Sequence, residues 1–250
     1  MKKLKKDLDF LKGIYIAHRG LHNNEAGIPE NSLLAFKEAL KLNMPVEFDL
    51  HLLKDGNIAV FHDDNLNRMT GCDKDIKNCT YNEIKDLKLL DTDERIPLFE
   101  DVLKLAGGKV LLDIEFKSDF PAGNLESKAC EYLDNYNGDF VVKSFDPFSV
   151  RWFKKNRPDF VRGQLACNFA ENKTLSSLKK FICRNMLVNI ITNPDFIAYE
   201  LQSMPNKKVA KYRKKKYPIL IWTVRSDEDL KNSEKYGDSF IYENIIINSE

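Results

Sequence analysis

The chain carries almost no net charge. Its 250 residues include 39 Lys and Arg against 38 Asp and Glu, which gives a formal net charge of +1. Proteins that bind nucleic acid usually have a strongly basic balance or a strongly basic face. This composition therefore argues against nucleic acid as a partner, and a function that depends on charge must come from a local group of side chains.

Cysteine is also scarce, and its spacing matches neither a zinc site nor a disulfide framework. The number is odd and no CxxC pair occurs; the five positions are Cys72, Cys79, Cys130, Cys167 and Cys183. Reduced thiols without such a pattern are typical of cytoplasmic proteins.

Long apolar runs are absent as well. No segment approaches the roughly 18 apolar residues of a membrane span. The first residues have the positive charges of a signal peptide, but Asp7, Asp9 and Lys12 interrupt the apolar stretch that such a peptide needs. We therefore expect a cytoplasmic protein without stable membrane insertion. No linker rich in Gly, Pro or Ser divides the chain, and its 43% hydrophobic content predicts a single domain over residues 1–250.

Two predicted strands show an unusual alternation of apolar and charged residues. Side chains alternate between the two faces of a strand. In the first strand the apolar face has Val46, Phe48 and Leu50, and the polar face has Glu47, Asp49 and His51. The segment Val110–Lys117 repeats the pattern, with Asp113, Glu115 and Lys117 on its polar face. Both strands therefore direct charged side chains to one side.

A tight turn follows the first of these strands. The segment Lys54–Asn57 contains Asp-Gly, which tolerates the positive φ of a hairpin turn. The returning strand is predicted to end at His62. This hairpin brings an imidazole toward the carboxylates of Glu47 and Asp49.

The rest of the chain alternates strands with helices. Further strands are predicted at residues 14–17, 140–144, 161–166, 187–192, 218–224 and 239–242. Helices are predicted around residues 33–40, 99–106, 125–136, 148–156, 176–183 and 227–236, with a helical piece near 81–89 and a helical stretch opened by Pro194. This pattern predicts an α/β fold, the (β/α)₈ TIM barrel, with a small inserted β-hairpin and helical segment after the second strand. An open doubly wound sheet is the competing architecture, but it gives no reason for carboxylates to point inward from two strands.

Carboxylates are expected to meet at the mouth of this barrel, where the carboxyl ends of the strands lie. Without a cation, Glu47, Asp49 and Glu115 would repel one another there. An all-oxygen set of ligands favours one hard divalent cation, Mg²⁺ or Ca²⁺. The alternative is that these carboxylates are solvated strand ends or form ion pairs with Arg19 and Lys117.

Two of the four histidines, His18 and His62, lie near the same predicted mouth. An imidazole titrates near neutrality, so two of them can divide the roles of general base and general acid. Arg19 and Lys117 carry the positive charge that a phosphate group needs. Trp222 either contacts substrate at the mouth or packs in the core.

A basic run lies near the end of the chain. Its members are Lys207, Lys208, Lys211, Arg213, Lys214, Lys215 and Lys216. The run offers transient contact with anionic lipid or with nucleic acid. A solvated helix or loop face is the more common role of such a run.

Short motifs occur in an order that resembles the glycerophosphodiester phosphodiesterases. They are His18-Arg19-Gly20, Pro29-Glu30-Asn31-Ser32, Glu47-x-Asp49, His62-Asp63, Ile96-Pro97-Leu98, Leu112-Asp113-Ile114-Glu115-Phe116-Lys117, Ser144-Phe145-Asp146 and Trp222-Thr223-Val224. Each motif alone is weak. Their order across most of the chain is a strong signal.

The resemblance implies a TIM barrel that hydrolyses glycerophosphodiesters to sn-glycerol 3-phosphate and an alcohol. The implied site residues are Glu47, Asp49 and Glu115 for one divalent metal, His18 and His62 for acid/base catalysis, and Arg19 and Lys117 for the phosphate. One segment departs from the family, whose last strand usually continues into Thr-Asp-x-Pro. This chain has Asp238–Asn244 there, DSFIYEN, and we expect an effect on substrate choice more than on chemistry.

Two alternatives share the barrel. One is an enzyme that acts on lysophospholipids at a lipid surface, an interpretation that the basic run favours. The other is a barrel that binds a phosphoester or a lipid surface without turnover. Retention of His18, His62 and the three carboxylates argues against the second, because a binder needs no acid/base pair.

Overall fold

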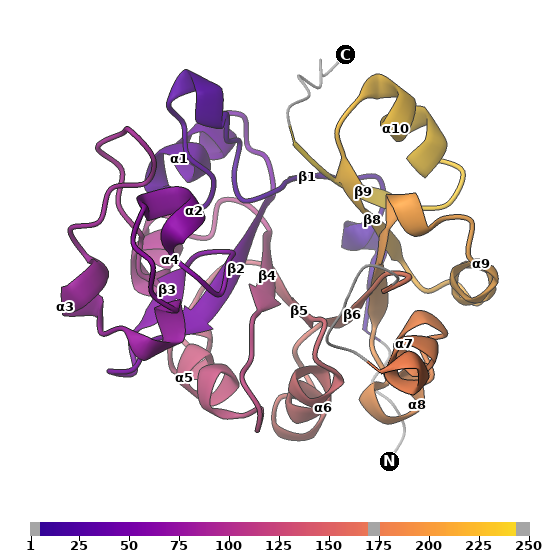
Figure 1. Ribbon diagram of the computed structural model, residues 1–250. Helices are drawn as coiled ribbons and strands as arrows, with labels where there is room; N and C mark the ends of the chain where they lie inside the picture. Colours follow the sequence, from indigo (N-terminus) through magenta and orange to yellow (C-terminus); the bar gives the residue numbers. More distant parts are fainter. Residues whose placement is uncertain (1–5, 170–175, 244–250) are drawn as a thin grey trace.

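The computed structural model describes residues 6–169 and 176–243. Eight parallel strands form a closed barrel, because β1 pairs with β9 on one side and with β2 on the other. Their bounds are β1 Tyr15–Ala17, β2 Val46–Leu52, β4 Leu112–Phe116, β5 Phe140–Ser144, β6 Arg162–Ala166, β7 Phe196–Glu200, β8 Ile219–Val224 and β9 Ser239–Tyr242. The predicted (β/α)₈ barrel is confirmed, and Figure 1 shows the strands surrounded by helices.

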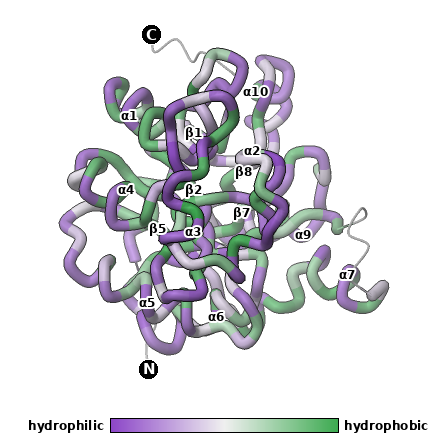
Figure 2. Tube along the Cα trace, turned by 60° about the vertical axis from the view of Figure 1, so that its left-hand side comes forward, coloured by the Kyte–Doolittle hydropathy of each residue, from purple (hydrophilic) through white to green (hydrophobic). Residues whose placement is uncertain are grey.

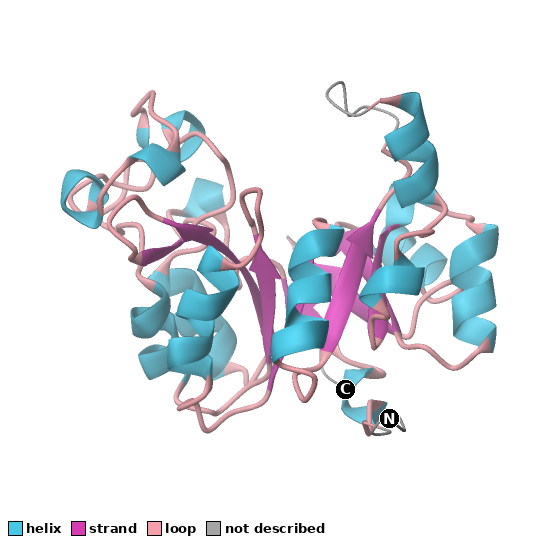
Figure 3. Cartoon of the chain, turned by 90° about the horizontal axis from the view of Figure 1, so that it is seen from below, coloured by secondary structure: helices cyan, strands magenta, loops and turns pink. Residues whose placement is uncertain are grey.

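Helices connect successive strands and cover the outside of the barrel (Figure 3). The connecting helices are α1 Leu33–Lys41, α4 Phe99–Ala106, α5 Asn124–Leu133, α6 Pro147–Asn156, α7 Ser177–Arg184, α8 Asn189–Thr192, α9 Lys207–Lys214 and α10 Asp227–Ser233. Short 3₁₀ turns lie at Asp9–Leu11, Asn24–Ala26, Ile76–Asn78 and Leu201–Ser203. The helix predicted at residues 99–106 has these bounds in the structure, and Gly107 ends it with a φ of +53°.

The outer faces of the strands pack against these helices. Phe48 of β2 is fully buried, and its ring centroid lies 5.7 Å from that of Phe36 in α1 and 6.1 Å from that of Phe99 in α4. Burying a side chain of this size stabilises the fold by roughly 1.5–3 kcal/mol. Because apolar residues of β2 face the helices, its charged residues face the inside of the barrel.

The predicted insertion after β2 is present, and it folds around its own small core. Strand β3, Ile58–Val60, pairs antiparallel with β2, and the helices α2 Asn67–Thr70 and α3 Tyr81–Ile84 follow. The buried side chains of the insertion include Leu53, Phe61, Leu66, Met69, Ile76, Ile84, Leu89 and Ile96. Helix α3 is shorter than the helical piece predicted near residues 81–89.

One predicted strand is wrong. Residues 187–192 do not form a strand; Asn189–Thr192 is the short helix α8, and the barrel strand is Phe196–Glu200, where Pro194 was expected to open a helical stretch. Ile190 is 83% exposed, so its apolar run is not a buried strand. A short apolar run alone does not distinguish a strand from a helix. Asn193 ends α8 with a φ of +46°.

Within the described ranges, no helix has both the length and the apolar character needed to cross a membrane.

Candidate active site

Three carboxylates from two adjacent strands meet at the mouth of the barrel. The register of β2 against β4 places Glu47 beside Asp113 and Asp49 beside Glu115. One carboxylate oxygen from each of Glu47, Asp49 and Glu115 lies within 4.8 Å of the others, and all three residues are buried. The structure therefore brings together the three acids that the sequence singled out. Their all-oxygen donor set and close spacing fit a hard divalent cation.

Lys117 balances part of the charge of this cluster. Its Nζ lies 3.0 Å from Asp49 Oδ1 and 2.5 Å from Glu115 Oε1. Burial acts to raise the pKa of Asp49, but the surrounding positive charges, of which Lys117 contributes most, and the hydrogen bond from Asn31 together outweigh it and lower this pKa well below its ordinary value. Asp49 is therefore ionised at neutral pH, and the ion pair that the sequence offered as an alternative role for Lys117 is present.

Lys143 is a second buried cation in this site, and the sequence analysis missed it. Its Nζ lies 2.6 Å from Asp113 Oδ2 and 3.2 Å from Glu47 Oε1. Strand register places it beside Glu115. Burial raises the pKa of Asp113 to about 6. A signal was available, since Lys143 is the one charged residue in the strand Phe140–Ser144.

Arg19 lies at the edge of the carboxylate cluster. Its Nη1 donates a hydrogen bond to Glu30 Oε1 at 2.7 Å, and its Nε lies 3.7 Å from Asp49 Oδ2. The backbone N–H of Arg19 donates to Glu47 Oε2 at 3.1 Å. Glu30 also accepts hydrogen bonds from Arg68, so this carboxylate holds two guanidinium groups.

Asn31 contributes a contact that the sequence did not indicate. Ser32, the last residue of the Pro29-Glu30-Asn31-Ser32 motif, is the N-cap of α1, and its Oγ accepts a hydrogen bond from the Ala35 N–H at 3.0 Å. Asn31 instead turns into the barrel, where its Nδ2 donates to Asp49 Oδ2 at 3.0 Å. The amide thus fixes one of the three carboxylates.

His18 lies between two carboxylates. Its Nε2 is 3.9 Å from Glu47 Oε2, and its Nδ1 is 2.8 Å from Glu243 Oε2. The backbone N–H of His18 donates to the Tyr242 carbonyl at 2.9 Å, which joins the end of β1 to the end of β9. One ring nitrogen therefore faces the carboxylate cluster and the other faces away from it.

His62, like His18, has its Nδ1 beside a carboxylate. Its Nδ1 lies 2.6 Å from Asp63 Oδ1, and Asp63 also accepts a hydrogen bond from Arg68 Nε at 2.6 Å. Burial acts to raise the pKa of Asp63, but its hydrogen bonds with His62 and Arg68 outweigh this effect, so the pKa is lowered. His18 and His62 both line one cavity of about 110 Å³ at the mouth, together with Glu47, Glu115 and Lys117.

His51 is predicted on the same strand face as the carboxylates. In the structure its ring contacts the backbone of His62. Its Nε2 lies 3.3 Å from the His62 carbonyl oxygen, and its side chain is buried. Burial lowers the pKa of His51. The ring is therefore neutral near physiological pH and donates to that carbonyl.

Trp222 lines the same cavity as His18 and His62. Its ring packs edge-on against Phe145 with 5.6 Å between centroids. The indole Nε1 is buried and has no hydrogen-bond partner among the described residues. Trp222 therefore packs on an aromatic neighbour and lines the cavity at the mouth, and its contact with substrate stays a prediction.

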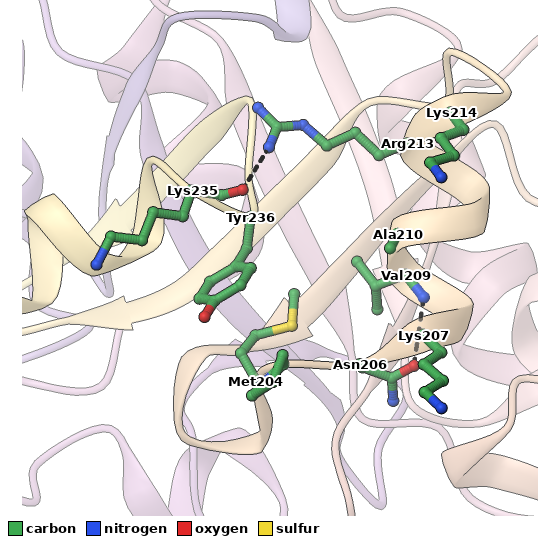
Figure 4. A pocket seen from close by; sticks show the side chains of 10 residues that line it. Met204, Asn206, Lys207, Val209, Ala210, Arg213, Lys214, Lys235 and Tyr236 are labelled. Carbon is green, nitrogen blue, oxygen red and sulfur yellow. Dashed lines mark hydrogen bonds between the residues drawn. The ribbon is translucent and has the colours of Figure 1, made fainter.

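A larger cavity, of about 570 Å³, lies outside the barrel between α9 and α10 (Figure 4). Apolar side chains of Met204, Val209 and Tyr236 line it, and Lys207 and Lys235 stand at its edge. None of the predicted site residues reaches it. The basic run forms helix α9, whose lysines are largely exposed.

The atypical segment Asp238–Asn244 contains the last strand, β9, and reaches the site through Glu243. Asn244 lies outside the described residues. We expected the segment to influence substrate choice, but the carboxylate of Glu243 contacts His18 directly. Burial acts to raise the pKa of Glu243, but its contacts with His18, His22 and Arg225 together outweigh it and the pKa is lowered. The departure from the family pattern therefore bears on a predicted catalytic residue.

Comparison with known proteins places the chain in one family. A sequence model of the glycerophosphoryl diester phosphodiesterase family matches residues 18–246. A glycerophosphodiester phosphodiesterase of Caldanaerobacter subterraneus subsp. tengcongensis is 31% identical over 242 residues, which cover 91% of this chain and 92% of that protein. A human lysophospholipase D is 31% identical over 142 residues, 51% of this chain and 43% of that protein.

Solved structures of related proteins share the fold. The Oleispira antarctica phosphodiesterase, solved in complex with its product sn-glycerol-3-phosphate, superposes with a TM-score of 0.77 at 21% identity, covering 93% of this chain and 94% of that one. A glycerophosphodiester phosphodiesterase of Parabacteroides distasonis superposes with a TM-score of 0.71 at 25% identity, covering 92% of each chain. Because the family match extends over nearly the whole barrel, the chain belongs to the glycerophosphoryl diester phosphodiesterase family.

Proposed function

We propose that this chain hydrolyses water-soluble glycerophosphodiesters to sn-glycerol 3-phosphate and an alcohol. The observation that supports this most directly is the cavity at the barrel mouth, which two imidazoles share with a cluster of buried carboxylates and a lysine. Family membership and the product bound to the Oleispira antarctica phosphodiesterase point to the same substrate class.

One divalent cation, Mg²⁺ or Ca²⁺, would be held by Glu47, Asp49 and Glu115. When bound, such a cation polarises the phosphodiester and lowers the pKa of the attacking oxygen. The fit rests on the three donor oxygens, which lie within 4.8 Å of one another in a buried setting. Lys117 already contacts two of these carboxylates, so it lies beside any phosphate that approaches the cation.

In this proposal, His18 and His62 each transfer a proton to or from the reacting groups through Nε2. Each Nδ1 lies within hydrogen-bonding distance of a carboxylate whose pKa is lowered, Glu243 for His18 and Asp63 for His62. An ionised carboxylate only accepts, so each Nδ1 holds a proton and donates it. One Nε2 then takes the proton of the attacking oxygen, and the other gives a proton to the leaving alkoxide.

Arg19 and Lys117 would bind the non-bridging oxygens of the phosphate. Both cations are already held by carboxylates, Arg19 by Glu30 and Lys117 by Glu115. Donors fixed in this way need little rearrangement when charge grows on the phosphate in the transition state. Trp222 would contact the organic part of the substrate at the cavity wall.

The test is direct. Purified protein given glycerophosphocholine or glycerophosphoethanolamine with Mg²⁺ or Ca²⁺ is expected to release glycerol 3-phosphate, and EDTA is expected to abolish the release. Full activity in EDTA would contradict the role of the cation. A His18→Ala variant separates an enzyme from a binder: the enzyme loses most of its rate while it still binds the cation, whereas a binder loses little.

A second candidate is turnover of lysophospholipids at a lipid surface, which one surface feature favours. Leu178 and Phe181 of α7 are 68% and 52% exposed, and α7 lies at the edge of the molecule, apart from the barrel (Figure 2). This candidate predicts activity on micellar lysophosphatidylcholine with no turnover of glycerophosphocholine. Cytoplasmic location and transient contact with lipid remain predictions from the sequence.

A further inference from the structure

A second group of metal-ligating side chains lies on the far side of His18 from the carboxylates. One donor atom from each of His18, His22 and Glu243 lies within 4.8 Å of the others. His18 Nδ1 is 2.8 Å and His22 Nε2 is 3.6 Å from the same carboxylate oxygen, Glu243 Oε2. Two imidazoles and one carboxylate therefore converge on one point.

His22 has no evident structural role in this position. Its side chain is 8% exposed, and neither of its ring nitrogens has a hydrogen-bond partner among the described residues. A buried polar group without a hydrogen bond is costly, so a water or an ion is expected to satisfy it. His22 Nε2 lies 3.6 Å from Glu243 Oε2, beyond hydrogen-bonding distance, and an ion between these two atoms would bind both.

The donor set selects a different ion from the one expected at the three carboxylates. Two nitrogens and one oxygen are typical ligands of Zn²⁺ and similar transition ions, whereas Mg²⁺ and Ca²⁺ prefer oxygen alone. Bonds of about 2.1 Å in a tetrahedral zinc site separate neighbouring donor atoms by roughly 3.4 Å. The distances from Glu243 Oε2 to His18 Nδ1, 2.8 Å, and to His22 Nε2, 3.6 Å, lie on either side of this value.

We propose that His18, His22 and Glu243 form a second cation site, for Zn²⁺ or a similar transition ion, whose occupation inhibits the enzyme. The inhibitory effect rests on the proposed role of His18 in hydrolysis. Binding to the site does not rest on that role, so the two parts are tested by different measurements.

Inhibition follows from the chemistry of the His18 ring. When an ion binds Nδ1 of the neutral ring, the single ring proton moves from Nδ1 to Nε2, the atom that faces Glu47; a doubly protonated ring releases its Nδ1 proton to solvent and keeps the one on Nε2. Without a lone pair on Nε2, the ring cannot take up a proton, and giving one up would leave an unfavourable imidazolate. Either catalytic role of His18 is blocked.

The positive charge of Arg225 repels a cation at this site. Replacing Arg225 should therefore have the opposite effect on cation binding to replacing His22. Arg225 Nε donates a hydrogen bond to Glu243 Oε1, while Glu243 Oε2 faces the two imidazoles. The Arg225 side chain is 50% exposed, so it can be replaced without opening the core. Removing its charge should strengthen binding of a cation at Oε2, since the repulsion is lost.

The binding experiment uses Co²⁺ as a spectroscopic probe of the full chain, with excess Mg²⁺ or Ca²⁺ to fill the carboxylate site. Wild-type protein should bind one Co²⁺ with the visible absorption of a nitrogen-ligated ion. His22→Ala should weaken this binding at least about tenfold, and Arg225→Gln should strengthen it. His22→Asn, closer in size to histidine, repeats the loss if His22→Ala proves unstable.

The inhibition experiment measures each protein against its own rate without zinc, at saturating Mg²⁺ or Ca²⁺. Zn²⁺ should inhibit the wild type, with a half-inhibiting concentration raised at least about tenfold by His22→Ala and lowered by Arg225→Gln. The proposal of a second site would be wrong if both His22 variants kept the Co²⁺ spectrum. It would also be wrong if zinc inhibited all the proteins equally. Normal Co²⁺ binding without any diester hydrolysis would instead contradict the proposed function alone.

Discussion

Buried carboxylates at the barrel mouth are paired with two lysines, Lys117 and Lys143. Lys143 lies between Asp113 and Glu47, and Lys117 between Asp49 and Glu115. Burial acts to lower the pKa of Lys143, but the negative charges of Asp113, Glu47 and Glu115 together outweigh it and raise the pKa. These lysines are therefore charged, and each keeps the like-charged acids around it from repelling one another.

Replacement of Lys143 tests this balance. Lys143→Met leaves Asp113 buried without its partner, and breaking a buried ion pair in this way costs about 3–5 kcal/mol. Urea unfolding should show a loss of this size in the free energy of unfolding. Lys128→Met is the matched control, since Lys128 pairs with Glu131 on the surface with 38% and 61% exposure, and it should lose less than about 1 kcal/mol. Equal losses would show that Lys143 is not needed to balance the buried charge.

Glu30 makes stability depend on pH. Burial acts to raise its pKa, but hydrogen bonds from Arg68 and the charge of Arg19 outweigh it and lower the pKa to about 2 from 4.5. Because the pKa in the folded state lies below that of the unfolded chain, this contribution is complete above pH 4.5 and is lost as pH falls toward 2.

Glu30→Gln should therefore lower the free energy of unfolding at pH 7 by on the order of 3 kcal/mol relative to the wild type. The difference in the free energy of unfolding between the wild type and Glu30→Gln should shrink steadily below pH 4.5. Urea unfolding at pH 7, 5, 4 and 3 measures it. A gap of the same size at pH 3 and pH 7 would exclude this role for the Glu30 carboxylate.

Strand alternation was enough to predict the three carboxylates, because a charged residue at every second position of a buried strand is unusual. It did not reveal Lys143, a single charge in an otherwise apolar strand. Glu243 and His22 were missed for a different reason. The closing of the barrel brings Glu243 to both histidines of the loop after β1, and Glu243 lies 225 residues from His18 in the sequence. Contacts of that range require the three-dimensional structure.

At the scale of elements, the loop between β1 and α1 is held by close backbone packing. Gly20 has a φ of +79°, and a Cβ at this position would lie 2.9 Å from the carbonyl carbon and the Cβ of Ala35 in α1. The third residue of the His-Arg-Gly motif is therefore glycine because the loop passes directly over the helix. This contact places His18 and Arg19 against the carboxylates.

Gly20→Ala should destabilise the protein by about 2–4 kcal/mol, since the methyl group adds a clash to the strain of a positive φ. It should also lower the rate of hydrolysis, because His18 moves with the loop. Gly27→Ala is the matched control: its φ is +76°, but no atom lies within 4 Å of the added Cβ. That variant should lose about 1 kcal/mol. Urea unfolding of both proteins gives the comparison.

Prediction of the elements succeeded where periodicity and end signals agreed. The helix at residues 99–106 has helical spacing followed by two glycines, and its bounds were predicted correctly. The strand error at residues 187–192 arose because β-branched residues favour strands, whereas tertiary context made Asn189–Thr192 helical. The buried segment Phe196–Glu200 follows a proline, which was taken as the start of a helix.

At the scale of the whole molecule, the barrel collects side chains from strands at both ends of the chain. The carboxylates come from β2 and β4, while His18 follows β1 and Glu243 follows β9. Pairing of β1 with both β2 and β9 joins these groups. The site therefore exists only when the barrel is closed.

The most direct test of the account is the release of glycerol 3-phosphate from glycerophosphocholine as a function of Mg²⁺ or Ca²⁺ concentration. Wild-type protein is compared with Glu115→Gln, and Glu131→Gln, at an exposed helix position, is the control. We predict no release by the wild type in EDTA, saturable release with the cation, and a need for about 10- to 100-fold more cation in Glu115→Gln. Release that does not depend on the cation, or the same half-saturating concentration in all three proteins, would contradict the account.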